Sequence, residues 1–147
     1  MYRTEHDLVG EKQIDQEAYY GIHSLRAAEN FPITNQHLPG AMIESMAWIK
    51  KACARANRMA GVLPGRIADA IERACDDLIA GKLHDQFIVD PIQGGAGTST
   101  NMNANEVIAN RAIELLGGKK GDYSLVHPND HVNCGQSTND IYPTCVK

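Results

Sequence analysis

A glycine-rich segment followed by hydroxyl side chains is the first part of this sequence whose residue types could do chemistry. The run Gly94-Gly95-Ala96-Gly97 cannot form a stable helix interior, and Thr98-Ser99-Thr100-Asn101 supplies candidate N-cap residues directly after it. A loop that opens a helix in this way offers unpaired N–H groups and a positive dipole end to an anion. The segment has no P-loop lysine and no GxGxxG pattern, so taken alone it also fits an ordinary capped loop.

A second cluster of hydroxyls and amides lies near the end of the sequence. The run Gln136-Ser137-Thr138-Asn139-Asp140 is typical of a turn, because Ser, Asn and Asp side chains bond to their own backbone. Both clusters nevertheless combine neutral donors and lack a cation. Because donors that are held in place stabilise charge that develops in a transition state, a shared task of holding an oxyanion is our hypothesis.

Other side chains that could do chemistry have simpler explanations. His127, His131 and Cys134 have a spacing that a metal site could use, but Pro128 opposes the helix that would place both histidines on one face. No fourth ligand is evident, so we expect a hydrogen-bonded polar loop and no metal. Glu106 could be a base or a helix-capping partner, and its position in the sequence does not decide between them.

Three apolar stripes with helical spacing must position these clusters. The first predicted helix covers residues 42–60 and has Ile49 on its apolar face, and the second covers residues 64–81. The third begins directly after the glycine-rich segment and ends at Gly117-Gly118. We expect the first two to form an antiparallel pair joined by a short turn.

The remaining pattern divides the chain into three regions of one domain. Residues 1–39 are irregular and rich in turn formers, which indicates an arm with short strands or turns. Residues 40–118 carry the predicted helices, and residues 119–147 are polar, contain two prolines and are predicted to be loops. A length of 147 residues fits a single domain. The expected fold class is therefore mainly α.

Composition excludes several classes of function. A net charge of −4 and only 5% aromatic residues give no support for nucleic-acid binding. No run approaches the roughly 20 apolar residues that span a bilayer, and the N-terminus has no apolar core of a secretory signal. The four cysteines form no CxxC pair, so we expect reduced thiols and a cytoplasmic location.

The two clusters and the segment between them resemble the signatures of the aspartase/fumarase superfamily. Residues 94–107 are similar to its first signature, residues 127–133 to its HPND loop, and residues 136–140 to its second signature. Three long motifs in order are far more specific than any one of them. The glycine loop reads GGAGTS, and this feature and residues 15–26 both favour the aspartase branch over class II fumarases.

The resemblance implies a reversible β-elimination of L-aspartate to fumarate and ammonia, without any organic cofactor. The residues that would contact the substrate are, by motif position, Thr98, Ser137, Thr138 and Asn139. The first three would hold the β-carboxylate, and the last would contact the amino or α-carboxylate side. The loop that forms a second, non-catalytic carboxylate site in fumarases corresponds to His127, Asn129 and Asp130.

The resemblance covers essentially all 147 residues but only the N-terminal domain of the family's longer chain. The catalytic serine loop, the central helical bundle and the C-terminal domain have no counterpart here, so the chain alone is expected to be inactive. Family active sites are built from residues of several subunits, so the resemblance implies a homotetramer. The expected partner is a small-molecule substrate, L-aspartate or fumarate, and neither nucleic acid nor a membrane is expected to bind. Two alternatives stay open: a class II fumarate hydratase-like domain, and a non-catalytic module for dicarboxylate binding or assembly.

Overall fold

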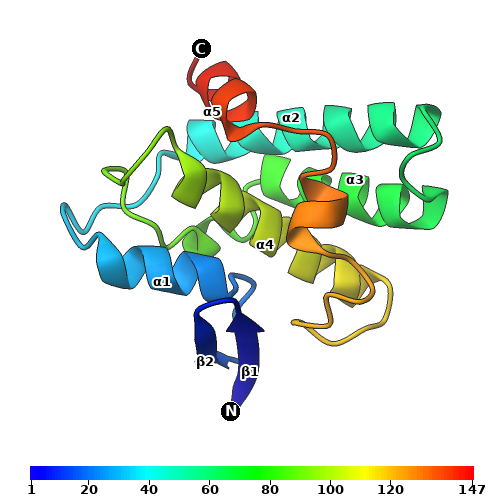
Figure 1. The fold of residues 1–147 in the computed structure, drawn as a ribbon. Coiled ribbons are helices and arrows are strands. Elements are labelled where there is room, and N and C mark those ends of the chain that lie inside the picture. Colours follow the sequence, from blue (N-terminus) through cyan, green and yellow to red (C-terminus); the bar gives the residue numbers. More distant parts are fainter.

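The chain folds around helices, with one small sheet near its N-terminus (Figure 1). The computed structural model describes all 147 residues. The helices are α1 (Ile22–Asn30), α2 (Gly40–Met59), α3 (Gly65–Ile79), α4 (Thr98–Leu115) and α5 (Thr138–Val146). A 3₁₀ turn (His84–Gln86), a π-helical turn (Pro128–Val132) and the strands β1 (Tyr2–Asp7) and β2 (Gly10–Asp15) complete the elements. The expected mainly-α class is confirmed, and no helix combines the length and the apolar character needed to cross a bilayer.

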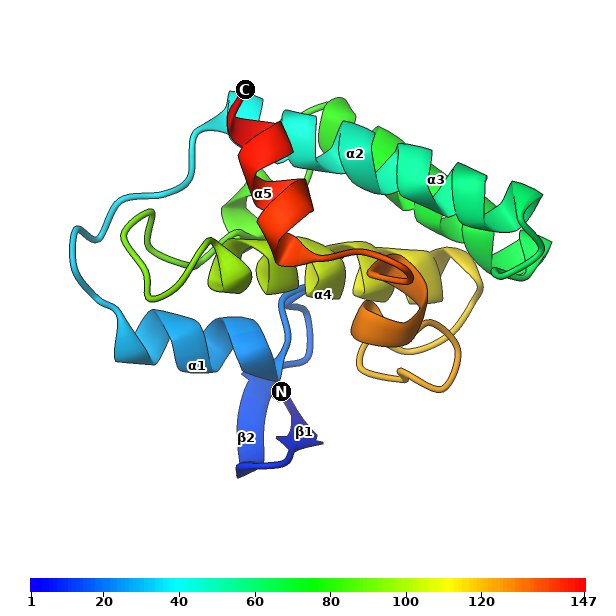
Figure 2. The same cartoon turned by 45° about the horizontal axis from the view of Figure 1, so that its top comes forward.

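Helices α2 and α3 form an antiparallel pair along one side of the molecule (Figures 1 and 2). Their bounds confirm the helices predicted for residues 42–60 and 64–81. Each helix is followed by a glycine with a positive φ, 72° at Gly61 and 82° at Gly81. These left-handed residues turn the backbone so that the next N–H groups bond to carbonyls of the last turn, which ends the helix.

The buried face of α2 is offset from the predicted apolar stripe. Its buried residues are Ile43, Met46, Ala47, Lys50 and Ala54. Ile49 packs against the core but is only half-buried, so it lies at the edge of the buried face and not at its centre. Because α2 packs against both α3 and α5, its buried side lies between two neighbours, and apolar spacing alone could not distinguish this side from the adjacent one.

Helix α4 runs through the centre, between the α2–α3 pair and α1 (Figure 2). It begins at Thr98, and Gly117-Gly118 ends it as predicted. Polar side chains on α4 are buried as well, and they bind the surrounding loops. The Asn103 side chain bonds to the backbone of Gln86 and Ile88, and the Asn110 side chain bonds to the backbone of Tyr19 and Gly121. The helix therefore serves as the frame to which the loops are tied.

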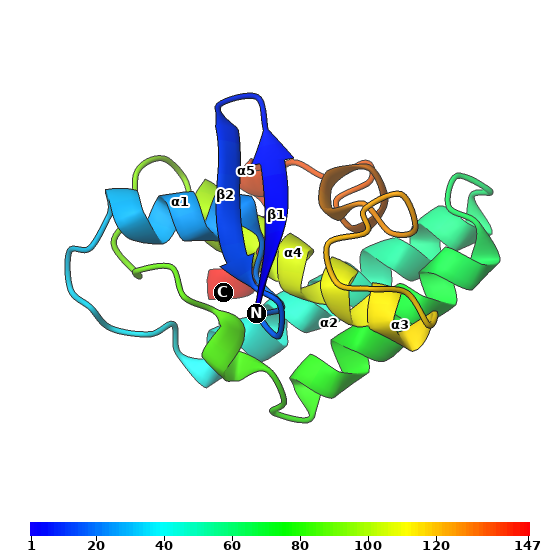
Figure 3. The same ribbon diagram turned by 90° about the horizontal axis from the view of Figure 1, so that it is seen from below.

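The first 39 residues are more regular than the irregular arm that we predicted. The antiparallel strands β1 and β2 pair from Tyr2↔Asp15 to Asp7↔Gly10, and α1 follows them (Figure 3). The helix was missed because its N-cap, Gly21, provides no side-chain cap. The backbone N–H groups of its first turn bond instead to the buried carboxylate of Glu106 on α4, which sequence proximity cannot indicate.

The last 29 residues also differ from the predicted loops. The π-helical turn and α5 lie in this region. Helix α5 contains Pro143, whose missing N–H argued against a helix, but Ile141 and Cys145 are buried one turn apart against the core. The packing of this face onto α2 outweighs the loss of one backbone hydrogen bond.

Candidate functional site

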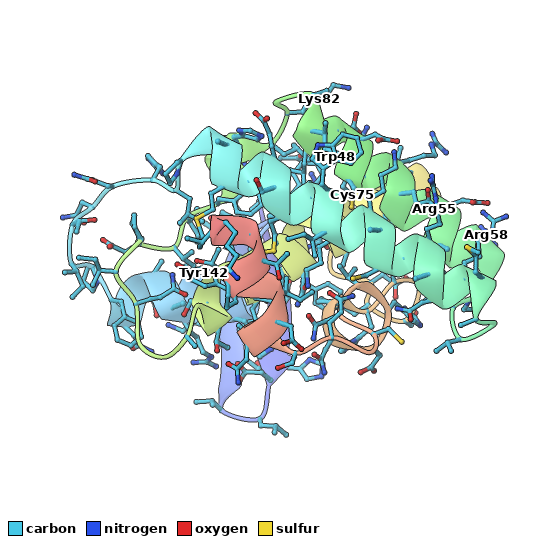
Figure 4. The ribbon with its side chains drawn as sticks, turned by 90° about the horizontal axis from the view of Figure 1, so that it is seen from above. Trp48, Arg55, Arg58, Cys75, Lys82 and Tyr142 are labelled. Carbon is cyan, nitrogen blue, oxygen red and sulfur yellow. The ribbon has the colours of Figure 1, made fainter.

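The structure brings the two hydroxyl clusters together, because the N-termini of α4 and α5 are adjacent. The Asn101 side chain, one turn into α4, donates through Nδ2 to Oγ1 of Thr138 at 3.0 Å, and Thr138 is the first residue of α5. A second contact joins the same elements. The Tyr142 ring on α5 packs over Gly97, the residue before α4 (Figure 4). Two helix ends that carry partial positive charge therefore face one region of the molecule.

The glycine loop has a conformation that depends on glycine at position 97. Gly97 has a φ of +88° and is buried, and a Cβ added there would lie 2.2 Å from the Tyr142 ring. Gly97 is itself the N-cap of α4, so the expectation that a hydroxyl side chain caps the helix is wrong. The backbone N–H groups of Thr98 and Ser99 consequently have no partner within the chain and are free donors.

Gln93 fixes the first turn of α4 in place of a side-chain cap. Its Oε1 accepts the backbone N–H of Thr100 at 2.9 Å, and its Nε2 donates to the Thr100 hydroxyl at 2.7 Å. Thr100 is thereby buried and used by the fold, whereas Thr98 is exposed at the helix end. Only Thr98 and Ser99 of this hydroxyl run are available to a ligand.

The second cluster is a helix cap rather than an isolated turn. Ser137 is the N-cap of α5, and its Oγ accepts the backbone N–H of Asn139 at 3.3 Å. The backbone N–H of Thr138 has no partner in the chain. Ser137 and Asn139 are exposed and Thr138 is half-buried, so their polar groups are accessible at the N-terminus of α5, as Thr98 is at the N-terminus of α4. These helix ends offer hydroxyl and N–H donors, and Asp140 lies in the first turn of α5.

A buried polar cluster supports the second hydroxyl run, and sequence reasoning missed it. Lys50 on α2 is fully buried, and its Nζ donates to Asn133 Oδ1 at 2.9 Å and to Gln136 Oε1 at 2.8 Å. Burial lowers the pKa of Lys50 to about 7. A signal was available, because Lys50 follows Met46 and precedes Ala54 at four-residue spacing and so lies on their helix face.

The residues of the second carboxylate site lie on a different loop. His127 is the N-cap of the π-helical turn, and its Nδ1 accepts the backbone N–H groups of Asn129 at 3.2 Å and Asp130 at 3.1 Å. The backbone N–H of His127 in turn donates to Nδ1 of His131 at 2.8 Å. Both imidazoles therefore use Nδ1 as an acceptor, and no group of three or more His, Cys, Asp or Glu side chains is placed to share a metal ion.

The same loop borders a pocket on the side of the β-hairpin. The pocket has a volume of about 430 Å³, and His127 lines it together with His6 and Tyr123. Asn129 and Asp130 are exposed. Neither the α4 nor the α5 N-terminus lines this pocket. His127 and Asn129 also line a second, smaller pocket, together with Met102 and Glu106 of α4.

Glu106 is a helix-capping residue: its side chain binds the N-terminus of α1. Its carboxylate is fully buried and accepts the backbone N–H groups of Gly21 at 2.8 Å, His23 at 2.9 Å and Ser24 at 3.1 Å, and also the Ser24 hydroxyl. Burial raises the pKa of Glu106, although these donors oppose the effect. The side chain caps α1 and does not line the surface between α4 and α5.

Comparison with known proteins relates this arrangement to a lyase family. Residues 10–147 match the family described as lyase. The chain is 59% identical over 145 residues to an aspartate ammonia-lyase of Bacillus subtilis, covering 99% of this chain and 30% of the relative. It is 54% identical over 145 residues to a class II fumarate hydratase of Halobacterium salinarum, covering 99% and 31%.

A solved structure shows the same fold. The crystal structure of a fumarate lyase:delta crystallin from Brucella melitensis in native form matches with a TM-score of 0.98 and 55% identity. The match covers 99% of this chain and 34% of that one. The chain thus spans about a third of the length of the proteins that it matches.

Proposed function

The chain belongs to the lyase family, as the N-terminal domain of the aspartase/fumarase type, and from this membership we propose that it contributes carboxylate-binding loops to an aspartate ammonia-lyase. The reaction would be the reversible β-elimination of L-aspartate to fumarate and ammonia. The observation that carries the proposal is the adjacency of two hydroxyl-bearing helix N-termini, joined by the hydrogen bond from Asn101 to Thr138.

The proposed contacts follow from which donors are free. Thr98, Ser137 and Thr138 would donate to the β-carboxylate, and Asn139 would contact the amino or α-carboxylate side. The unpaired backbone N–H groups of Thr98 and Thr138 support this assignment, because carboxylates bind favourably where N–H groups and a helix dipole point outward.

The arrangement suits the charge that this elimination develops. A base removes a proton from the carbon beside the β-carboxylate, and the electron pair of the broken C–H bond delocalises onto the two carboxylate oxygens. The resulting enediolate then expels ammonia as the C–N bond breaks and the C=C bond of fumarate forms. Neutral donors fixed at two helix ends would stabilise the enediolate more than the ground-state carboxylate, and this difference lowers the barrier.

The remaining functional assignments rest on the family resemblance together with local geometry. His127, Asn129 and Asp130 would form a second carboxylate site. In support, His127 and Asn129 line a common pocket, next to which Asp130 follows in the chain. We assign the base to a serine loop outside these residues, because no catalytic base is evident among them. A tetramer whose subunits share active sites, and a cytoplasmic location, are part of the same proposal.

The proposal is tested in a full-length enzyme that carries these residues. This chain would replace the matching N-terminal part of the Bacillus subtilis aspartate ammonia-lyase, which is 59% identical over that part. Thr98→Val, Ser137→Ala and Thr138→Val should each lower kcat by about 10²–10³-fold, the effect typical of losing one oxyanion donor. Thr144→Val is the matched control, since this exposed hydroxyl lies further along α5 and donates to the backbone of Asp140.

Two outcomes would redirect the assignment. If all three variants keep the kcat/KM of the parent for aspartate, the loops are structural and the non-catalytic alternative gains support. If the parent converts malate to fumarate but does not release ammonia from aspartate, the class II fumarate hydratase alternative is favoured. The 54% identity to the class II fumarate hydratase of Halobacterium salinarum is the observation behind this alternative.

A further inference from the structure

Lys50 is a buried amino group that has no carboxylate partner. Its side chain is fully buried, it takes part in none of the ion pairs of the chain, and its only acceptors are the amide oxygens of Asn133 and Gln136. Removing an ammonium group from water is costly, and a methionine would fill similar space without that cost. Stability therefore gives no reason for a lysine at this position, and its contacts lead toward the second hydroxyl run.

The two amides that accept from Lys50 are oriented by the backbone. Asn133 Nδ2 donates to the Gln136 carbonyl at 3.2 Å, and Gln136 Nε2 donates to the Val132 carbonyl at 2.8 Å. With their NH₂ groups used in this way, both amide oxygens point at the ammonium group. Lys50 thus closes the turn that leads directly into Ser137.

The orientation passes from this turn to the hydroxyl of Thr138. Asn133 Oδ1 also accepts from Asn101 Nδ2 at 3.1 Å, and the second hydrogen of Asn101 Nδ2 goes to Thr138 Oγ1 at 3.0 Å. Because Thr138 Oγ1 accepts from inside the protein, its own hydrogen is free to donate outward. Asn101 Oδ1 is buried without a hydrogen-bond partner. If the Asn101 amide flipped, this oxygen would face Thr138 and accept the hydrogen of its hydroxyl group.

We propose that Lys50 is a positioning residue that keeps the Thr138 hydroxyl available as a donor to the substrate carboxylate. The Nζ of Lys50 holds the oxygen of Asn133 inward, and that oxygen holds the NH₂ group of Asn101 toward Thr138. Without Lys50, the side-chain amides of Asn133 and Asn101 can flip by about 180°. The Thr138 hydroxyl then donates its hydrogen to Asn101 Oδ1 and not to the substrate. The inference rests on the proposed role of Thr138 in binding the β-carboxylate.

A double-mutant cycle in the full-length chimera tests this relay. Lys50→Met should lower kcat/KM for aspartate by about tenfold or more, because the two hydrogen bonds that orient the amides of the site are lost. Combined with Thr138→Val, which removes the hydroxyl, the same change should cost less than about threefold, because nothing is left to orient. Lys51→Met is the matched control, since Lys51 is the next residue of α2 and pairs with Asp76 at the surface.

A merely structural role predicts different measurements. The melting temperature of Lys50→Met should equal or exceed that of the parent, whereas a structural role predicts a lower value together with the loss of activity. Lys50→Gln retains a shorter donor and should keep more activity than Lys50→Met. The proposal is overturned if Lys50→Met costs the same factor with and without Thr138→Val, or if the Gln variant is the worse of the two.

The failure of this inference differs from the failure of the proposed function. If Thr138→Val alone leaves kcat/KM unchanged, the carboxylate-binding role of Thr138 is wrong. If Thr138→Val lowers kcat/KM but Lys50→Met does not, only the positioning role of Lys50 is wrong.

Discussion

Gly97 is the residue at which the glycine loop and α5 meet. Two independent requirements exclude a side chain there: the backbone is left-handed, with a φ of +88°, and the Tyr142 ring occupies the space of a Cβ. Gly117, which ends α4, has a similar φ of +82°, but nothing lies within 4 Å of a Cβ added there. A substitution at Gly117 therefore tests the cost of the left-handed backbone alone, whereas a substitution at Gly97 adds the clash with the Tyr142 ring.

We expect Gly97→Ala to lower the free energy of unfolding more than Gly117→Ala does. The left-handed backbone costs about 1–2 kcal/mol for an alanine at either position, and overpacking against Tyr142 adds about 1–3 kcal/mol at Gly97 only. Urea denaturation of the two variants measures the difference. Equal losses would show that the Tyr142 ring moves aside without cost, and that the contact between the loop and α5 is loose.

At the scale of elements, α2 shows how the buried face of a correctly predicted helix can be offset from its apolar stripe. The structure centres this face on Met46, Ala47 and Lys50, with Ile49 at its edge. We expect Met46→Ala, at a side chain only 1% exposed, to lower the free energy of unfolding by about 2–4 kcal/mol. Ile49→Ala should cost less, because half-buried Ile49 already meets solvent. Thermal or urea unfolding of the Met46→Ala and Ile49→Ala variants measures the two losses of stability. A larger loss for Ile49→Ala would contradict the assigned buried face.

The elements that the sequence predicts are those with local signals. Helices α2, α3 and α4 have apolar spacing and a glycine at the C-terminal end, and all three form as expected. Helix α1 is capped by a side chain 82–85 residues away, and α5 depends on packing against α2, so neither has a local signal that outweighs its turn formers. Short-range patterns thus predict the frame but not the elements that dock onto it.

The candidate site likewise has residues that the sequence predicts and one supporting residue that it does not. The motifs indicate Thr98, Ser137 and Thr138 because their residue types and order are specific, and the structure places their helix ends side by side. The supporting role of Lys50 was not predicted, because a lysine inside an apolar stripe is normally assigned to solvent. Such a contribution depends on which amides converge in space, and spacing along the chain does not encode this.

At the scale of the whole molecule, we expect the 147-residue chain alone not to release fumarate from L-aspartate. The donors between α4 and α5 could hold an enediolate, but the proton must still be removed, and stabilisation and proton transfer act in the same transition state. Glu106 is buried as the cap of α1, and both imidazoles of the His127 loop use Nδ1 to accept backbone hydrogen bonds.

The measurement is ultraviolet absorbance of fumarate with the purified chain at high concentration. The chimera that supplies the rest of the enzyme is the positive control. Turnover by the chain alone that Thr98→Val abolishes would contradict the expectation, because contamination would then be excluded and a base would have to lie within these residues.

The cap that α4 supplies to α1 also sets an order of events during folding. A nine-residue helix is marginal in water, and the N–H groups at its start wait for a carboxylate that is synthesised more than 80 residues later. On the ribosome, the hairpin and α1 therefore emerge before α4, but the capping of α1 cannot be completed until α4 has followed them out. The docking of α1 onto α4 therefore waits for residues far along the chain, and closing this long loop is a slow, non-local step of folding.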